Sequence, residues 1–374
     1  MLCSTSIIKN ETYLRQVHLK IYTDKDFVRN GAIYNYIPLM YPFWGECDST
    51  KSHIDIGRFD EYTKNGHIFF SLASIEESDV VILPSEWPEG GDYPEAQMLL
   101  QFAAVWKKPI IVFFNSDSME KIPVDNAIIF RTSFYASEKK ENEFALPGWN
   151  IDFLNYVPEC VIKKKTTVPT VSYCGYVDYY NVFGKSFIYQ LLRTIRYGKD
   201  SNPGKALRGR AVRKLRKSAI VNTEFIIRSR TLQYKTDSAE ILRMEYVKNI
   251  MNADYALVVR GKGNFSYRLY EVLSCGRIPV FVNTDCVLPF DHIIDWKKYM
   301  VWVEASDIHK IAEKVAEFHA SLSEQEFKQL QLSIRKLYDE WIKPTAFYAN
   351  LWRCLPGKML EKSQLNNNNS FRNA

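Results

Sequence analysis

The chain has 374 residues, of which 46% are hydrophobic and 25% charged, and its formal net charge is +6. That length and apolar content are enough for two cores of ordinary size, so two domains are expected. The charge suits an anionic substrate or a membrane surface without deciding between them. Seven scattered cysteines without a C-x-x-C pair argue against a disulfide framework or a zinc knuckle and favour a reducing compartment.

Apolar runs in the first half alternate between strand and helix patterns. We predict strands at residues 17–22, 79–83, 109–114 and 127–130, and helices near residues 61–74 and 94–106. This alternation is typical of an α/β fold. A loop rich in Pro and Gly, residues 84–94, follows a buried strand and precedes a helix, a position that faces the ligand cleft in such folds. The loop carries Glu86 and Asp92.

The second half continues the alternation after a basic stretch, residues 163–165, which marks the expected interdomain linker. The predicted strands are residues 220–227, 255–259 and 277–282, and the predicted helices are residues 238–251, 264–275, 307–319, 324–338 and about 344–353. We therefore divide the chain into an N-terminal domain (1–162), a C-terminal domain (163–340) and a terminal segment (341–374). The terminal segment ends in an Asn-rich tail, residues 366–369, that we expect to be disordered.

Residues 254–290 combine two apolar strands with a Gly-bearing turn and a helix whose first turns carry Ser, Arg and Glu. A strand–helix–strand unit of this length predicts a parallel crossover. Its ligand is expected beyond the carboxyl ends of the strands, where the loop meets the positive end of the helix. Arg260 and Lys262 lie in that loop and can reach an anion there. Ser266 stands where a dinucleotide fingerprint has its third glycine, and the sequence has no P-loop motif.

Arg268 and Glu271 lie three residues apart on one face of the predicted helix. As an isolated surface ion pair they would contribute only a few tenths of a kcal/mol. Their place near a helix start that already has two cations favours a second interpretation. Arg offers a planar fork for phosphate and Glu accepts hydrogen bonds from vicinal sugar hydroxyls, which together describe a nucleotide diphosphate with its ribose.

The run Arg260-Gly261, Ser266-x-Arg268-Leu269-x-Glu271, Gly276-x-Ile278-Pro279-Val280, Leu288-Pro289-Phe290 and Asp295-Trp296 resembles the exostosin family of glycosyltransferases. The C-terminal half of that family carries such motifs at this spacing. The resemblance is strong over the motif region and weaker, but collinear, over residues 78–303. Two positions depart from the family pattern: Val259 stands where Pro is frequent, and Cys275-Gly276-Arg277 replaces a Gly-Cys pattern.

This resemblance implies an α/β fold of the GT-B type, with two Rossmann-like domains facing across a cleft and the last helices crossing back to the first domain. It also implies inverting transfer of a sugar from a nucleotide sugar, usually a UDP-sugar, to a hydroxyl of a glycan or lipid-linked glycan acceptor. We expect no metal or other cofactor, because cations of the protein neutralise the leaving diphosphate. The expected donor site comprises Arg260, Gly261, Lys262, Asn264, Ser266, Arg268 and Glu271.

The transfer also requires a base for the acceptor hydroxyl, and the facing domain must supply it. Glu86 and Asp92 are our candidates, although a cap or an ordinary loop carboxylate is an alternative for each. His53 and Asp55 form an H-x-D pair that is the next candidate and that, as a lone pair, is commonly an ordinary surface feature. Asp24 and Asp26 form a D-x-D, which holds a metal in the GT-A fold. We interpret this D-x-D as a solvated turn, because it lies so close to the start of the chain.

Residues 185–217 contain eleven Lys or Arg against one acidic residue, Asp200. A solvated face is one interpretation, and contact with a diphosphate, anionic lipid or a lipid-linked acceptor is another. Nothing matches a nucleic-acid module. No apolar stretch long enough for an anchor occurs, so we expect a cytoplasmic protein, peripheral to a membrane at most, or a Golgi luminal one if an anchor has been removed. Two other functions stay open: a non-catalytic GT-B-like protein that binds glycan or nucleotide, and a basic membrane-surface or nucleic-acid-binding protein.

Overall fold

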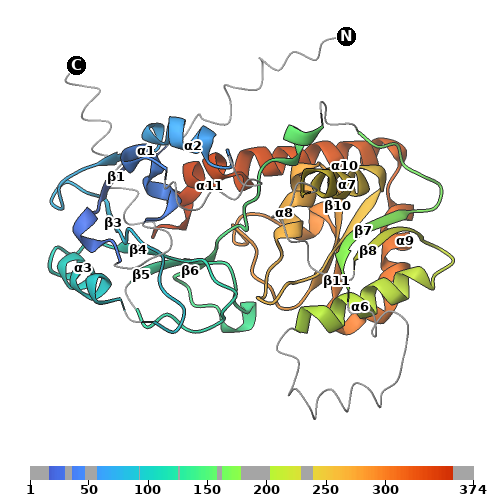
Figure 1. The fold of residues 1–374 in the computed structure, drawn as a ribbon, viewed down its shortest axis with the longest axis horizontal. Helices are drawn as coiled ribbons and strands as arrows, with labels where there is room; N and C mark the ends of the chain where they lie inside the picture. The colour runs from blue at the N-terminus through green and yellow to red at the C-terminus, as the bar shows by residue number, and fades with distance from the viewer. Residues whose placement is uncertain are drawn as a thin grey trace, which may run out of the picture.

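The computed structural model describes residues 17–29, 36–46, 57–91, 93–124, 127–157, 162–177, 203–228 and 239–356. These residues form two α/β lobes that lie side by side (Figure 1). Each lobe is built on a sheet whose strands are all parallel. The α/β architecture with two Rossmann-like domains of the GT-B type is therefore confirmed.

The sheet of the first lobe has its strands in the order β2-β1-β3-β4-β5-β6. Their bounds are β1 Leu19–Tyr22, β2 Phe70–Leu72, β3 Val80–Ile82, β4 Ile110–Phe114, β5 Ala127–Arg131 and β6 Glu143–Ala145. Every residue of β3, β4 and β5 is buried, as expected for parallel strands that are covered on both faces. The helices of this lobe are α1 Tyr41–Trp44, α2 Asp60–Asn65 and α3 Pro94–Val105.

The sheet of the second lobe has the order β11-β10-β9-β7-β8. Its strands are β7 Thr170–Tyr176, β8 Asn222–Arg228, β9 Tyr255–Val258, β10 Ile278–Asn283 and β11 Val301–Glu304. The helices in this half of the described chain are α6 Pro203–Arg216, α7 Ala239–Asn252, α8 Tyr267–Ser274, α9 Ile311–Ser321, α10 Glu324–Leu337 and α11 Pro344–Asn350. The division at residues 162 and 163 is compatible with this distribution of strands but stays a prediction.

Each sheet reverses its strand order beside its first strand. In the first sheet β1 lies between β2 and β3, and in the second β7 lies between β8 and β9. At such a switch point the chain leaves two neighbouring strands in opposite directions, which opens a crevice at the carboxyl edge of the sheet. The segments after β1 and β3 meet at the first switch point, where the backbone N–H of Arg29 donates to the hydroxyl of Ser85 at 3.0 Å. Ligands are expected at these two edges.

The helix predicted over residues 61–74 is wrong in its second half. Helix α2 ends at Asn65, and β2 follows at Phe70–Leu72. At Gly66, just past the helix end, an added Cβ would lie 2.2 Å from the ring of Pro42. The next residues then join the edge of the sheet, so strand pairing with β1 overrides the local helical pattern. The short strands β6 and β11 were also absent from the prediction.

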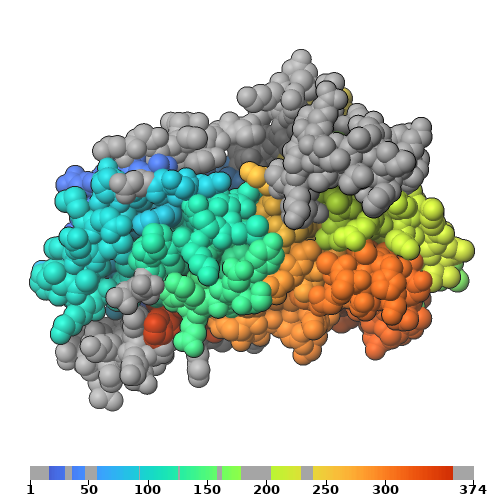
Figure 2. Space-filling model, turned by 90° about the horizontal axis from the view of Figure 1, so that it is seen from below, coloured from blue at the N-terminus to red at the C-terminus, as the bar shows by residue number. Residues whose placement is uncertain are grey.

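The two lobes are joined by a seam of polar contacts and by a shared apolar core. Tyr135 pairs with Cys286 in an antiparallel bridge, the backbone N–H of Ser137 donates to the Asp285 carboxylate at 3.1 Å, and Lys139 forms an ion pair with Asp291 at 2.8 Å. Figure 2 shows the two halves in broad contact on one face. Sites at the carboxyl edges therefore lie close to residues of the other lobe.

The end of the described chain returns to the first lobe (Figure 1). Helix α10 continues as a π-helical turn, Tyr338–Ile342, and α11 then packs against α2. The ring of Tyr348 lies 4.2 Å from that of Tyr62, and the indole of Trp149 donates to the carbonyl of Ile342 at 2.7 Å. The ring of Phe347 lies 5.8 Å from that of Phe130. Part of the core of the first lobe is thus supplied by α11.

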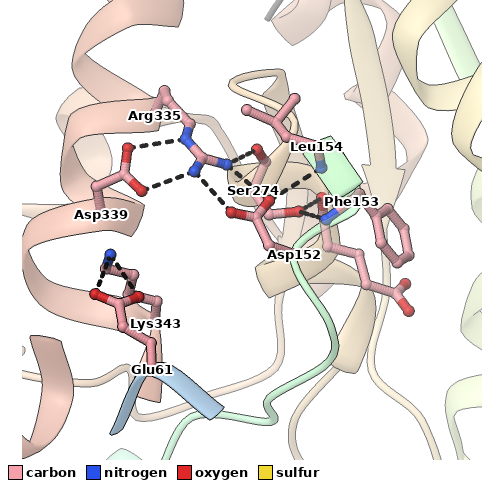
Figure 3. A network of polar contacts seen from close by, with 9 residues as sticks. Glu61, Asp152, Phe153, Leu154, Ser274, Arg335, Asp339 and Lys343 are labelled. Atoms are coloured by element: carbon pink, nitrogen blue, oxygen red, sulfur yellow. Dashed lines mark hydrogen bonds and ion pairs between the residues drawn. The ribbon is translucent and has the colours of Figure 1, made fainter. Parts of the chain in front are cut away.

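Arg335 of α10 fixes the end of α8 to the segment that connects the lobes (Figure 3). Its guanidinium bonds both carboxylate oxygens of Asp152 and both of Asp339, at 2.7 to 2.9 Å. It also donates to the carbonyl of Ser274, the last residue of α8, at 2.5 Å. A cation at this position complements the negative end of the helix. The C-terminal end of α8 is therefore firmly placed, which leaves its N-terminal end as the one open to a ligand.

Candidate functional site

A cavity of about 420 Å³ opens at the second switch point, between the ends of β7 and β9. Its walls come from β7, β8, α6, α7, the loop 259–266 and the first turns of α8. Seven of the lining side chains are cationic and two are carboxylates: Lys205, Arg208, Arg228, Arg243, Arg260, Lys262, Arg268, Asp117 and Glu271. This excess of positive charge favours an anionic ligand.

Arg268 is firmly held in the wall of the cavity. Its guanidinium lies 4.2 Å from the ring centre of Tyr173 and 5.2 Å from that of Tyr246, and its Nη2 donates to the carbonyl of Cys174 at 2.6 Å. Burial lowers the pKa of Arg268, but Tyr246, Tyr173 and Glu271 raise it above its ordinary value, so the side chain stays charged. Its Nη1 is buried and finds no hydrogen-bond partner among the described residues. A buried charged donor without an acceptor is costly, so this atom points to an anionic ligand.

Two glycines allow close approaches around the cavity. An added Cβ at Gly175 would lie 2.7 Å from Nη2 of Arg268, so the guanidinium occupies space that a side chain at residue 175 would fill. An added Cβ at Gly204 would lie 2.2 Å from the carbonyl oxygen of Gly261 and 2.4 Å from that of Arg260. The first turn of α6 therefore sits directly on the loop after β9.

Glu271 is 7% exposed, so it is not the surface carboxylate of an ordinary helical ion pair. Its Oε1 accepts from the side-chain amide of Asn150 at 2.6 Å and pairs with Arg243 at 3.4 Å. Its Oε2 accepts from the hydroxyl of Tyr246 at 2.5 Å. These partners fix the carboxylate in the cavity wall and leave part of its acceptor capacity unused. Its predicted role toward a ribose stays a prediction.

Arg260 lines the cavity, but its guanidinium forms most of its hydrogen bonds with other groups of the protein. Its guanidinium donates to the carbonyl oxygens of Gly263 at 3.1 Å and Lys262 at 3.2 Å, and to the hydroxyl of Tyr135 in the first lobe at 3.3 Å. The backbone N–H of Gly261 donates to the carbonyl of Phe265 at 2.9 Å. These bonds give the loop its shape, and Lys262 lies exposed on it. Arg260 thus positions the loop that was predicted to bind an anion.

The helix predicted to begin at Asn264 begins three residues later, at Tyr267. The side-chain amide of Asn264 donates to the carbonyls of Phe134 and Asp285, and its carbonyl accepts from Thr284, which fixes an extended connection between the lobes. Asn264 is 1% exposed and does not line the cavity. Ser266 is the N-cap, lines the cavity and makes no side-chain hydrogen bond to the helix.

Four cations of the cavity were not assigned to the donor site from the sequence. Lys205 and Arg208 come from α6, Arg228 from the end of β8, and Arg243 from the buried face of α7. The basic segment 185–217 gave a signal for the first two, although residues 178–202 lie outside the described residues. Arg228 had a weaker signal as a charge at the carboxyl end of a strand.

Glu86 follows β3 at the first switch point. Burial raises its pKa to about 7, while a hydrogen bond with the side chain of Asn115 and the charges of Arg58 and Arg29 oppose the rise. Glu86 is not part of the cavity lining. Asp92, His53 and Asp55 lie outside the described residues.

Asp117 lies in the loop after β4. It is the one described residue of the first lobe that lines the cavity. Its Oδ1 accepts from the backbone N–H of Gly263 at 3.2 Å. Asp117 was not among the residues predicted from the sequence, although its position soon after a predicted strand was a usable signal.

Asp24 caps a short 3₁₀ turn, Lys25–Phe27, with its Oδ1 accepting from the backbone N–H of Asp26 at 3.0 Å, as expected for a turn. Within the described ranges, no group of three or more His, Cys, Asp or Glu side chains is arranged to hold a metal ion. Cys174, Cys275, Cys286 and Cys354 are free thiols. No helix in the described part of the chain has the length and apolar character that a membrane span needs.

Two parallel sheets, two adjacent lobes and a cationic cavity at the switch point of the second sheet define a protein of the GT-B class. Residues 197–318 match the family model of the Exostosin GT47 domain. This part of the chain is therefore similar to the exostosin family, as the motifs within it predicted.

Parts of the chain are also similar to known proteins. An Exostosin-1 homolog of Caenorhabditis elegans is 33% identical over 107 residues, 29% of this chain and 27% of that protein. Exostosin-1 of Drosophila melanogaster is 38% identical over 68 residues, 18% of this chain and 9% of that protein. A protein of Oryza sativa named a probable glucuronosyltransferase is 36% identical over 66 residues, 18% of this chain and 16% of that protein. The matches thus span between 9% and 27% of the length of these relatives.

Proposed function

We propose that this protein is an inverting glycosyltransferase that moves a sugar from a nucleotide sugar, most simply a UDP-sugar, to a hydroxyl of a glycan acceptor. The observation that carries the proposal is the buried, unpartnered Nη1 of Arg268 in a cavity with seven cationic side chains. A diphosphate would supply the acceptor that this donor lacks. Because one relative is named a probable glucuronosyltransferase, a donor of glucuronosyl groups is the first to assay.

The cations of the cavity would stabilise the leaving group. As the bond between the anomeric carbon and the diphosphate oxygen breaks, negative charge grows on the diphosphate, and fixed donors aimed at that charge lower the barrier. Arg268 would make the principal contact, with Lys262 and Ser266 at the rim of the cavity. Arg260 and Gly261 would act by shaping the loop, and Glu271 would accept hydrogen bonds from the ribose. This arrangement would need no metal ion or other cofactor.

A base would take the proton of the acceptor hydroxyl as its oxygen attacks the anomeric carbon. Glu86 is the first candidate, because a pKa raised to about 7 leaves a carboxylate both available and basic near neutral pH. Its place at the switch point of the first lobe would bring it to the acceptor rather than to the nucleotide. Asp92, in the same loop, is the second candidate, and His53 or Asp55 would come next.

The acceptor is proposed to be a glycan or a lipid-linked glycan. Helix α6 supports the second form, because Lys205 and Arg208 line the cavity while Arg210, Lys214 and Arg216 are exposed. Such a row of cations could hold the protein at an anionic membrane surface beside a lipid-linked acceptor. We propose a cytoplasmic location for this reaction, with the Golgi lumen as the alternative.

The test of the donor site is calorimetric titration of UDP without added divalent metal. Replacing Arg268 by Ala removes a charge-assisted contact that is worth about 1.5 to 3 kcal/mol, so affinity should fall roughly 10- to 150-fold. Arg210→Ala is the matched control, because it removes an exposed cation of α6 from outside the cavity. Equal affinities in the two variants would overturn the assignment of Arg268.

Further outcomes separate the alternative functions. Binding that is abolished by EDTA would favour a metal-dependent site with Asp24 and Asp26 as its ligands. UDP binding without turnover of any donor would indicate a non-catalytic GT-B-like protein. An affinity that is dominated by salt and indifferent to nucleotide sugars would indicate a basic surface-binding protein.

A further inference from the structure

The loop after β9 receives a carboxylate from the opposite lobe. Oδ1 of Asp117 accepts the backbone N–H of Gly263 at 3.2 Å, and Asp117 also lines the cationic cavity. The approach is close, because an added Cβ at Gly263 would lie 2.9 Å from Oδ1 and 3.0 Å from Cα of Asp117. The hydroxyl of Ser133 holds the loop of Asp117 by donating to its backbone carbonyl at 3.2 Å. An anion of the protein itself therefore occupies one N–H of the proposed anion-binding loop.

The charges around Asp117 show how its carboxylate would affect a bound anion. Seven cationic side chains line the cavity, and the other lining carboxylate, Glu271, is already engaged by Asn150, Tyr246 and Arg243. Asp117 is exposed, and its contact with Gly263 is to a neutral backbone group. A diphosphate at this loop would lie next to the carboxylate, and two anions at one site repel.

The same geometry argues against Asp117 as the base of an inverting transfer. Such a base lies across the sugar from the leaving diphosphate, whereas Asp117 touches the loop that would hold the diphosphate. We infer that Asp117 is a resident counter-ion of the cavity, which competes with the diphosphate of the ligand and so weakens its binding and speeds its release. This inference rests on the proposed function, because it assumes that the diphosphate binds beside residues 260–263.

Asp117→Asn tests the inference with little change of shape. The amide keeps an oxygen that can accept the N–H of Gly263, so the loop stays anchored while the negative charge is lost. We expect UDP to bind roughly five- to fiftyfold more tightly, the range for one partly screened like-charge contact, and the gain should shrink as salt is raised. Stopped-flow dissociation of UDP should slow by a similar factor.

Glu141→Gln is the matched control, because it removes the same charge from an exposed site in the same lobe outside the cavity. It should leave UDP affinity within twofold of the wild type. Equal gains in Asp117→Asn and Glu141→Gln would overturn the inference in favour of a general effect of net charge. Unchanged or weaker UDP binding in Asp117→Asn alone would also overturn it, and unchanged affinity with lower turnover would make Asp117 the base.

Failure of this inference can be told apart from failure of the proposed function. If Arg268→Ala weakens UDP binding and Asp117→Asn leaves it unchanged, the donor site stands and the counter-ion role falls. If neither the wild type nor Asp117→Asn binds UDP, both fall. Asp117→Ala provides a second test. It should also tighten UDP binding if removal of the charge outweighs loss of the hydrogen bond to Gly263. Weaker binding in both variants would show that the role of Asp117 is to hold the loop through that hydrogen bond.

Discussion

The two switch points of the molecule have the same topology and different chemistry. At the second, cations from β8, α6, α7, α8 and the loop after β9 surround a cavity, and the buried Nη1 of Arg268 finds no partner within the described ranges. At the first, the distinctive group is a carboxylate, Glu86, whose pKa burial raises to about 7 despite two nearby arginines. The topology opens a crevice at each place, and the side chains beyond the strand ends decide what it can bind. This difference is what the proposed function expects, with the leaving group at the second switch point and the acceptor at the first.

The largest expected effect concerns the carboxylate side of this comparison. Glu86→Gln should lower turnover by about 10² to 10⁴ and leave UDP affinity nearly unchanged, because a base contributes in that range and does not touch the nucleotide. Steady-state assays with donor and acceptor, paired with UDP titration, measure both quantities. Asp92→Asn should be assayed separately as the other candidate in the loop. If both variants keep turnover near that of the wild type, the loop is structural and His53 or Asp55 should be replaced next.

The pH dependence of the stability of Glu86→Gln provides a separate check that the pKa of Glu86 is raised. Since the pKa of Glu86 is raised from 4.5 to about 7, the folded protein holds this proton more tightly than the unfolded chain. The stabilising contribution is complete below about pH 4.5 and is lost as pH rises through about 7. Denaturant unfolding should therefore show Glu86→Gln gaining stability relative to the wild type between about pH 5 and pH 8. A difference that is constant over this range would show that Glu86 titrates normally.

An intermediate effect is expected on the cationic side from a glycine that leaves room for Arg268. Gly175→Ala would place a methyl group 2.7 Å from Nη2 of Arg268, too close for both groups to keep their positions, and displace the guanidinium from its carbonyl partner. UDP affinity should fall roughly ten- to fiftyfold, because a charge-assisted bond depends on geometry. The control is a double-mutant cycle: in the Arg268→Ala background the same change should add little further loss. Additive losses would mean that Gly175 acts independently of Arg268.

The smallest expected effect tests Glu271. If its carboxylate accepts from the ribose, 2′,3′-dideoxy-UDP should bind about two- to tenfold more weakly than UDP, a modest loss because three protein donors already share that carboxylate. Glu271→Gln should then reduce the discrimination between the two ligands while thermal unfolding shows an intact fold. A wild-type protein that binds both ligands equally would limit Glu271 to holding Asn150, Tyr246 and Arg243.

The features that could be predicted from the sequence are those that arise from local patterns. Buried strands such as Ile110–Phe114 appear as continuous apolar runs, and Arg268 could be placed on a helix face beside a Gly-bearing loop. The late start of α8 could not be predicted, because the side chain of Asn264 is used by Phe134 and Asp285, two residues far apart in the chain. For the same reason the contact of Arg260 with Tyr135 and that of Asp117 with Gly263 could not be predicted, since each joins the two lobes. Local periodicity carries no information about such long-range contacts.

The return of the chain to the first lobe has a consequence for the order of events during synthesis. The strands of the first sheet end at Ala145, but Phe347 and Tyr348, which pack on Phe130 and Tyr62, are made much later. At about 5 to 20 residues per second, the ribosome reaches α11 roughly ten to forty seconds after it completes the last strand of the first sheet. During that interval the nascent first lobe exposes an apolar surface that α11 later covers. The newborn protein is therefore exposed to chaperones and to aggregation until α11 has been made.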